Sequence, residues 1–294
     1  MPAISLQAAF FFLSLISLTH SQTPDVQFTI LEELPVGTPV GNISTLSTIF
    51  PDLAGEDRNS LRYGILNQAT IPGALFNITL TEGVIYVAAR VDREELCRVT
   101  GTEESDCILR INILVYGKDP SQKQEIVTAD FRVLDINDNS PEFARSKVIL
   151  KVTEKNSVDT VLKVSGAIDK DYEPDFTVKN YTMDKFKDIF HLTASETLDG
   201  SSEIDLRLLK SLDREETPEY EFTVTAYDGG SPPRSAELRV KVEVTDQNDN
   251  QPVFLNETYH VTIDGKMAPG HVILKVSAVD ADEGINAVIS YDFR

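Results

Sequence analysis

The chain is short of the residues on which many enzymes and nucleic-acid-binding proteins depend. Its 294 residues include four histidines and two cysteines, and 27 basic side chains stand against 47 acidic ones, a formal charge of −20. Phosphate binding needs a basic stripe, and no cluster of lysine and arginine occurs, so nucleic acid is excluded as a partner. A zinc or catalytic site built from histidine and cysteine has little material here. The sequence also lacks a Gly-rich phosphate loop and a nucleophile elbow, and we expect neither an enzyme nor a small-molecule substrate.

Long apolar runs are also scarce. Residues 8–18 (AAFFFLSLISL) form an apolar run of about 11 residues, which is too short to cross a bilayer but suits a signal peptide. Small residues at Thr19 and Ser21 fit a cleavage site, so we expect a signal peptide over residues 1–21. No other run approaches the 18 residues of a membrane span, so any membrane attachment would need a segment absent from this chain. The expected location is extracellular: the plasma membrane if the full-length chain has an anchor, and the secreted space if it ends here.

What the chain does have is an internal repeat. The segment Val91–Glu95 (VDREE) recurs at Leu212 (LDREE) after 121 residues, and Leu134–Phe143 (LDINDNSPEF) recurs at Thr245 (TDQNDNQPVF) after 111 residues. The unit is therefore about 110 residues long. This spacing predicts one repeat over residues 22–139, a second over 140–250 and a partial third over 251–294.

Within each unit the hydrophobic period is two. In Ala236–Val244 (AELRVKVEV), one face carries Leu238, Val240, Val242 and Val244, while charged residues alternate with them. Runs of this kind also begin at Val148, Phe76 and Ile108, and Gly/Pro turns separate them. Short alternating strands without a sustained 3.6 period predict antiparallel β-sandwiches, an all-β fold. Helical pieces such as DREEL at Asp92 are expected to last about one turn.

Acidic motifs recur at the same places in each unit. They are a Glu near its start, DREE, DxNDN at the boundary between units, and DxD in the following unit. Oxygen ligands without histidine or cysteine favour Ca²⁺ or Mg²⁺, and the number of carboxylates favours Ca²⁺. Solvated surface charge would explain one acidic pair but not four motifs in register. An EF-hand lacks its glycine and its helices here. Its final glutamate is missing in the first copy, and although the second copy has Glu257 at that position, Gln251 and Pro252 break the required turn. A glycosidase pair would occur once in a cleft rather than at each boundary.

DREE, DxNDNxPxF, DxD and AYDGG on a β repeat of this length resemble the extracellular repeats of cadherins. Three segments are more similar to clustered protocadherins: DREELC with a second cysteine downstream, INILVYGKD and DADEGINAVISYDFR. The resemblance implies tandem Greek-key, immunoglobulin-like sandwiches in a rod, with the last repeat truncated. Some cadherins dock an N-terminal tryptophan into a partner repeat, and this chain has no tryptophan, so that strand exchange is excluded.

The resemblance also implies a ligand set at each joint, with about three Ca²⁺ per complete joint. Backbone carbonyls contribute in addition to side chains. The first set is Glu32, Asp92, Glu94, Asp135, Ile136, Asn137, Asp138, Asn139, Asp169, Asp171 and Asp228. The second set is Glu154, Asp213, Glu215, Asp246, Gln247, Asn248, Asp249, Asn250, Asp280, Asp282 and Asn286. Without metal, charges this close repel one another by about 1–4 kcal/mol per pair, so Ca²⁺ is expected to stiffen the joint.

Two covalent features are expected outside the joints. Cys97 and Cys107 enclose nine residues, and in a secreted protein a disulfide is the default, with two free thiols as the alternative. Sequons place candidate N-glycans at Asn42, Asn77, Asn180 and Asn256.

These features lead to a calcium-dependent cell-adhesion ectodomain that recognises like protocadherin molecules on a facing cell. The alternative is a soluble ligand or decoy made from a truncated transcript.

Overall fold

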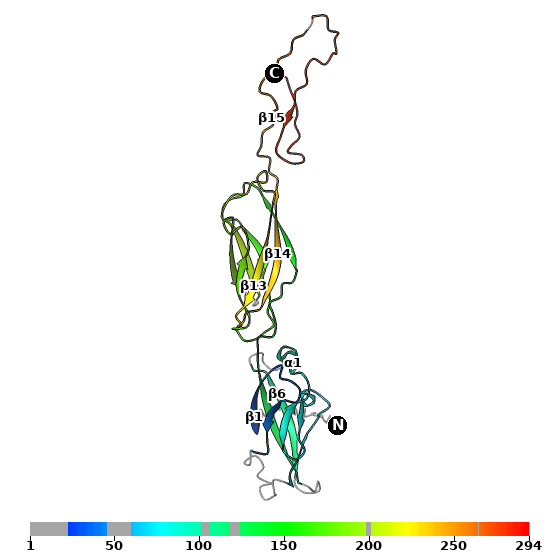
Figure 1. Ribbon diagram of the computed structural model, residues 1–294, viewed down its shortest axis with the longest axis vertical. Coiled ribbons are helices and arrows are strands. Elements are labelled where there is room, and N and C mark those ends of the chain that lie inside the picture. Colours follow the sequence, from blue (N-terminus) through cyan, green and yellow to red (C-terminus); the bar gives the residue numbers. More distant parts are fainter. Residues whose placement is uncertain are drawn as a thin grey trace, which may run out of the picture. The chain divides into compact units, whose positions relative to one another are not determined.

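The computed structural model describes residues 23–45, 60–100, 106–117, 124–197, 201–263 and 265–293. The predicted signal peptide, residues 1–21, lies outside these ranges. The chain divides into two compact units, Met1–Leu134 and Asp135–Arg294, which we call unit 1 and unit 2. The regular structure that is described in both units is almost entirely β-strand, which confirms the predicted all-β fold (Figure 1).

Unit 1 is a sandwich of two sheets. One sheet has the order β1-β7-β6-β3 and the other the order β2-β5-β4. The alternating run at Ile108 forms β6, and the run at Phe76 begins β4, as predicted. The strands are β1 (Val26–Leu31), β2 (Pro39–Asn42), β3 (Arg62–Ile65), β4 (Phe76–Ile78), β5 (Val84–Val87), β6 (Ile108–Tyr116) and β7 (Gln124–Leu134), and a short 3-10 helix, η3, covers Gly73–Leu75.

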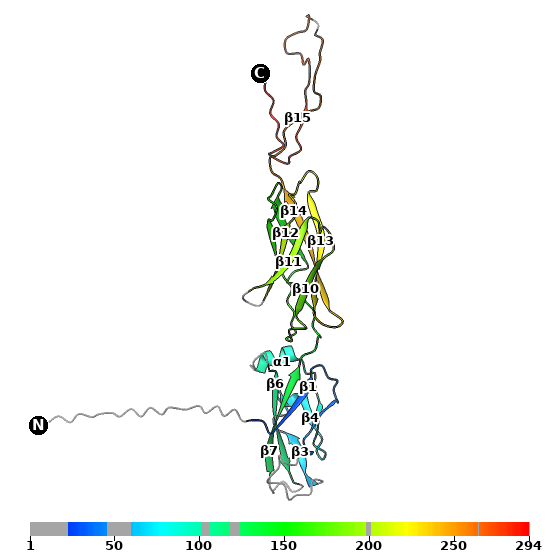
Figure 2. The ribbon, with the colours of Figure 1, turned by 90° about the vertical axis from the view of Figure 1, so that its left-hand side faces the viewer.

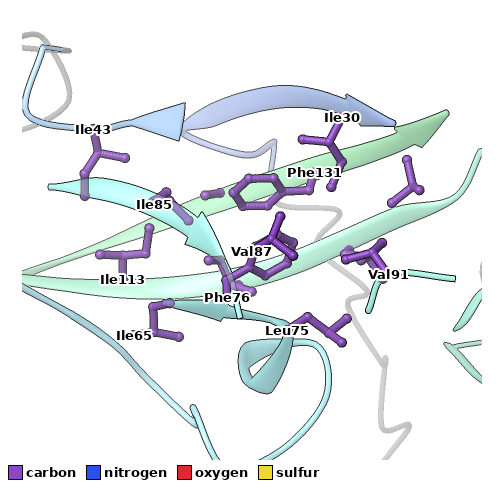
Figure 3. Packing of buried hydrophobic residues seen from close by; sticks show 14 of the residues in the cluster. Ile30, Ile43, Ile65, Leu75, Phe76, Ile85, Val87, Val91, Ile113 and Phe131 are labelled. Atoms are coloured by element: carbon purple, nitrogen blue, oxygen red, sulfur yellow. The ribbon is translucent and has the colours of Figure 1, made fainter. Parts of the chain in front are cut away.

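The core of unit 1 lies between these sheets. Phe131 of β7 stacks on Phe76 with ring centroids 4.3 Å apart and on Phe28 at 5.1 Å. Figure 3 shows Phe131 facing side chains of the other sheet, including Ile85 and Val87. Inward positions on β6 and β7 are buried, whereas the residues between them, apart from the buried Asp130, are partly or fully exposed. The period of two therefore places the apolar face against the core.

Unit 2 repeats this construction. Its sheets have the orders β10-β13-β14-β8 and β11-β12-β9, and β11 and β12 can be followed beside the β13–β14 layer in Figure 2. Phe190 and Phe222 pack in the core with ring centroids 5.3 Å apart. The strands are β8 (Lys147–Thr153), β9 (Val161–Ser165), β10 (Val178–Met183), β11 (Phe190–Glu196), β12 (Ser202–Leu208), β13 (Glu219–Asp228) and β14 (Ser235–Thr245).

The expectation of purely antiparallel sheets was wrong at one pair in each unit. β1 runs parallel to β7 over six residue pairs, and β8 runs parallel to β14 over seven, from Lys147 opposite Arg239 to Thr153 opposite Thr245. The other strand pairs that the structure describes are antiparallel. The first strand of a repeat lies beside the last strand, and both run toward the same end of the sandwich, so their pairing is parallel.

One helical segment is longer than predicted. α1 covers Arg93–Thr100, eight residues instead of about one turn. The Cys97–Cys107 disulfide is present, as expected, and it joins α1 to the residue before β6. This bond ties the helix to the core, which explains how so polar a segment holds two turns.

Residues 251–293 form little regular structure. β15 (Val253–Phe254) pairs with β16 (Ala278–Val279) over two residues each. Apolar side chains of this part are exposed, for example Val272 and Ile285. Among the described residues, no helix has the length and apolarity that a membrane crossing requires.

Candidate metal centres

The first acidic group consists of Glu32, Asp92 and Glu94 in unit 1. Glu32 follows β1 directly, is 2% exposed, and accepts a 2.7 Å hydrogen bond at Oε2 from the backbone N–H of Arg93. Asp92 precedes α1 and accepts a 2.9 Å bond at Oδ1 from the backbone N–H of Glu95, which makes it the helix N-cap. Carboxylate oxygens of the three residues lie within 4.8 Å of one another. Such closely spaced negative charges favour a shared cation.

An arginine lies beside this group. The Arg90 guanidinium places Nε 2.7 Å from Glu33 Oε1 and Nη1 2.8 Å from Asp92 Oδ2. It therefore pairs with one predicted ligand and with the acidic residue that follows Glu32. The charges of Arg90 and Glu33 cancel. The buried Arg93 guanidinium, with Nη1 3.6 Å from Glu94 Oε1, offsets part of the negative charge of the first acidic group.

The second acidic group is in unit 2, where the segment before β8, the loop after β9 and the end of β13 meet. One oxygen of each carboxylate is used for structure. Asp135 Oδ2 accepts the backbone N–H groups of Tyr172 (2.9 Å) and Glu173 (2.5 Å). Asp171 Oδ1 accepts the backbone N–H (3.1 Å) and Nδ2 (2.8 Å) of Asn139. The group comprises Asp135, Asn137, Asp169, Asp171 and Asp228.

In the second acidic group, the other oxygen of each aspartate and the amide oxygen of Asn137 have no hydrogen-bond partner. These buried atoms are Asp135 Oδ1, Asn137 Oδ1, Asp169 Oδ2, Asp171 Oδ2 and Asp228 Oδ2. Burial raises the pKa of Asp169, and the charge of Asp228 adds to the shift. Burial also raises the pKa of Asp171, with further contributions from Asp169 and Asp135. Buried acceptors that lack donors are costly, and a hard divalent cation is the partner that this all-oxygen set fits.

A glycine makes room for one of these acceptors. A Cβ on Gly230 would lie 1.5 Å from Asn137 Nδ2, so any side chain there would displace Asn137. The same turn fixes Asp228, whose Oδ1 accepts the backbone N–H groups of Gly230 (3.0 Å) and Arg234 (2.8 Å). Gly230 of AYDGG therefore belongs to the site, although sequence reasoning assigned only the aspartate.

The third acidic group also lies in unit 2 and consists of Glu154, Glu215, Asp246, Asp249 and Asp282. Glu154 is 1% exposed, and it accepts the backbone N–H groups of Arg214 (2.9 Å) and Gln247 (2.8 Å). Two sets of three carboxylates have oxygens within 4.8 Å of one another: Glu154, Glu215 and Asp249, and Glu215, Asp246 and Asp282.

The third group repeats the geometry of the second. Asp282 Oδ1 accepts the backbone N–H (3.2 Å) and Nδ2 (2.8 Å) of Asn250, as Asp171 does from Asn139. Asp282 is 6% exposed, and its Oδ2 is buried without a hydrogen-bond partner. The backbone N–H of Asp282 donates to Asp280 Oδ1 at 3.0 Å. The DxNDN and DxD segments thus form the same interlocked turn twice.

Basic side chains reach into the third acidic group, and sequence reasoning missed them. Arg214 Nε lies 2.8 Å from Asp246 Oδ1, and its Nη2 contacts Glu215 and donates to the Ala281 carbonyl at 2.8 Å. Burial pushes the pKa of Asp246 upward, but hydrogen bonds from Asn286 and Arg214 hold it below its ordinary value. Burial raises the pKa of Glu215, and Glu154 adds to that shift. The arginine of DREE was the available signal, because it separates two acidic residues.

A lysine holds two further carboxylates at this end of unit 2. Lys155 Nζ lies 3.1 Å from Asp213 Oδ2 and 3.2 Å from Asp249 Oδ2. These hydrogen bonds raise the pKa of Lys155 and lower that of Asp213. Asp213, a predicted ligand, therefore pairs with a lysine here. It lies outside the two sets of three, as Asp280 does.

The four sequons differ in their surroundings. Asn77, Asn180 and Asn256 are exposed, whereas Asn42 is partly buried. Asn42 Oδ1 accepts hydrogen bonds from the backbone N–H (2.9 Å) and the hydroxyl (2.7 Å) of Ser44, the third residue of its own sequon. Glycosylation at all four positions stays a prediction.

Comparison with known proteins agrees with this architecture. A family model described as a cadherin domain matches residues 149–245, and one described as cadherin-like matches residues 25–117. Human protocadherin gamma-B2 is 34% identical over 282 residues, which cover 95% of this chain and 28% of that protein. The chain therefore spans less than a third of the length of this relative.

Solved structures extend the likeness to three dimensions. The structure of mouse clustered PcdhgC3 EC1-3 has a TM-score of 0.74 and 31% identity, and covers 89% of this chain and 78% of that one. Mouse cadherin-23 EC22-24, at 23% identity and a TM-score of 0.67, shares the fold over 90% of this chain and 78% of its own. The sandwiches, the recurring acidic turns and these matches lead to one assignment: the chain belongs to the cadherin superfamily, and its repeats are of the protocadherin type.

Proposed function

We propose that this chain is part of an extracellular adhesion protein whose consecutive repeats are held by calcium. It would recognise like molecules on a facing cell. The proposal draws on the similarity to protocadherins over 95% of the chain and on the three acidic groups. The chain covers 28% of protocadherin gamma-B2, so adhesion by the whole protein is inferred from this part.

One observation supports calcium more than any other. In the second acidic group, four carboxylates each give one oxygen to structural hydrogen bonds and leave a second, buried oxygen without a donor. The turn that holds Asp171 through Asn139 recurs at Asp282 through Asn250. A solvated acidic surface would expose such oxygens to water. Repeated burial of unpaired oxygens is what a cation site requires.

The ligand assignment follows the sets named from the sequence, with about three Ca²⁺ at a complete junction. Calcium supplies a positive centre that accepts six to eight oxygens in flexible geometry. The chain's own residues hold those oxygens in place: Asn139 orients Asp171, the backbone of Tyr172 orients Asp135, and Gly230 leaves space for Asn137. Extracellular modules bind calcium at about 10⁻⁴ to 10⁻³ M, so the groups would be filled outside the cell.

The remaining assignments are part of the same proposal. Residues 1–21 would direct secretion, and repeats would occupy residues 22–139, 140–250 and 251–294. The relatives are protocadherins rather than enzymes, and we assign this chain no catalytic role. The place of action would be the cell surface, with glycans at the sequons.

Calorimetry and bead aggregation test the proposal together. Purified chain in chelator-treated buffer should release or absorb heat when titrated with CaCl₂ to 2 mM, and the variant Asp171→Asn should bind fewer ions or bind them more weakly. Asp188→Asn is the matched control, because Asp188 is exposed and pairs with Lys210 at 2.8 Å. Beads coated with the same chain extended to the length of its relatives should aggregate in calcium and disperse in EGTA.

Two results would contradict the proposal. Absence of calcium binding by the wild-type chain at 2 mM would remove the metal sites. Bead aggregation that persists undiminished in EGTA would leave calcium binding in place but reject its role in adhesion.

A further inference from the structure

The residue after the first recurring glutamate, Glu32 in one repeat and Glu154 in the other, differs in charge between the two repeats. Glu33 follows Glu32, and Lys155 follows Glu154. Both residues have a left-handed backbone, with φ of 55° and 52°. Both donate the same backbone hydrogen bond at 2.9 Å, Glu33 to the Val91 carbonyl and Lys155 to the Leu212 carbonyl. The two positions are therefore structurally equivalent, and each lies beside the aspartate of a DREE segment.

The charges around that aspartate are different. In unit 1, Asp92 is paired with Arg90, and Glu33 balances the arginine. In unit 2, Asp213 is paired with Lys155, and the residue equivalent to Arg90 is Ser211. The two side chains next to Asp92 sum to zero charge, whereas those next to Asp213 sum to +1. Lys155 also bonds Asp249, which is one of the carboxylates of the third acidic group.

We propose that Lys155 acts as a tethered cation at the edge of the third acidic group. It binds Asp249 of that group and the neighbouring Asp213, and an incoming calcium ion must displace it. The inference rests on the calcium binding proposed above and concerns what this chain adds to it. A second observation shows that the group is built for a cation: Asp282 is 6% exposed and its Oδ2 is buried without a donor. Lys155 itself is 46% exposed, so its ammonium can move into water when a divalent ion arrives.

Such a lysine has two opposite effects. When calcium is scarce, it neutralises part of the acidic group and limits the repulsion between Asp213 and Asp249. When calcium is present, the ammonium repels the incoming ion and competes for the same oxygens. A unit charge facing a divalent ion at about 6 Å changes affinity by about tenfold in water, and by less if the lysine swings away. We therefore expect a threefold to tenfold change.

The test compares two lysine variants of the full chain by hydrogen–deuterium exchange over a range of calcium concentrations. The readout is the calcium concentration that half-protects a peptide covering residues 246–250, with a peptide covering 135–139 as internal reference. Lys155→Gln should lower that concentration about threefold to tenfold for 246–250 and leave 135–139 unchanged. In calcium-free buffer the same variant should exchange faster than wild type at 246–250.

Lys163→Gln is the matched control. Lys163 also contacts two carboxylates, Glu203 and Asp205, but it lies on β9 and outside the acidic groups. If Lys155→Gln moves the half-protection point no further than Lys163→Gln, the role of Lys155 is overturned while calcium binding stands. If neither peptide of the wild-type chain responds to calcium, this inference and the proposed function both fail.

Discussion

Replacing Asp171 by asparagine should stabilise the calcium-free protein, which is unusual for a change at a buried polar residue. Asp171 is 3% exposed, and its Oδ2 has no donor. The charges of Asp169 and Asp135 act on it. An asparagine can keep its Oδ1 on the two donors of Asn139, and its Nδ2 would face acceptors in place of a second negative oxygen.

The magnitude follows from Coulomb's law. Two carboxylates about 5 Å apart repel by about 0.8 kcal/mol at the dielectric constant of water and by about 3 kcal/mol at an effective value of 20. Taking the lower end, because the neighbours can relax, Asp171→Asn should add about 1 kcal/mol to the free energy of unfolding of the calcium-free second repeat. For a domain of this size that is about 3–6 °C in Tm.

Calcium should cancel the extra stability of Asp171→Asn. At 2 mM calcium, a site with a Kd of about 0.1 mM stabilises the folded state by about 1.8 kcal/mol, and a tenfold weaker site by about 0.7 kcal/mol. The variant should therefore gain about 1 kcal/mol less from calcium than the wild type does. Its Tm in calcium should stay close to that of the wild type, so the gap between the melts in EGTA and in calcium narrows.

Differential scanning calorimetry of both proteins, in EGTA and in 2 mM CaCl₂, measures these four melting temperatures. Asp188→Asn serves again as the control and should leave the gap unchanged. The reasoning is refuted if Asp171→Asn lowers Tm equally in EGTA and in calcium, because the carboxylate would then be a structural acceptor only.

Three further predictions concern acidity, space and covalent linkage. Burial raises the folded-state pKa of Asp169 and Asp171, so the folded calcium-free chain retains protons that the unfolded chain releases. The Tm of the calcium-free chain should therefore rise as pH falls from 7.5 toward 5, and it should rise less in Asp171→Asn. Calcium affinity measured by calorimetry should fall over the same range, because protons compete with the ion. A Tm that falls over this range equally in both proteins would contradict the assignment. Gly230→Ala should weaken calcium binding several-fold, because a Cβ there meets the Asn137 side chain, while Gly64→Ala, where a Cβ meets nothing within 4 Å, is the control with unchanged calorimetry. Replacing both cysteines of the Cys97–Cys107 disulfide by serine opens a bond that links residues ten positions apart. The free energy of unfolding of the first repeat, measured by urea denaturation, should fall by about 2–3 kcal/mol. An unchanged denaturation midpoint would mean that the bond adds no stability.

Most of the fold could be predicted from the alternation of apolar residues. The run at Ala236 became β14 and the run at Ile108 became β6, because a period of two has one face to bury whichever strand it pairs with. The parallel pairing of the first strand could not be predicted in this way. Direction depends on where the chain crosses the sandwich, and the period is the same in both directions.

The acidic groups were predictable from the register of the repeat, which brought Asp171 and Asp282 into the same turn through Asn139 and Asn250. The basic side chains were not. The partners of Lys155 lie 58 and 94 residues away in the sequence. In the sequence, Lys155 cannot be distinguished from an ordinary surface lysine. The left-handed turn after Glu154 determines which carboxylates the Lys155 ammonium reaches. Sequence patterns alone do not reveal this turn.

The parallel pair in unit 2 also bears on how a repeat would carry tension. β8 enters at one end of the sandwich and β14 leaves at the other, and seven consecutive residue pairs join them. A pull on the two ends would slide these strands lengthwise against each other, so several evenly spaced hydrogen bonds must break at once instead of one after another. Each sandwich is thus arranged to resist stretching along its own strands.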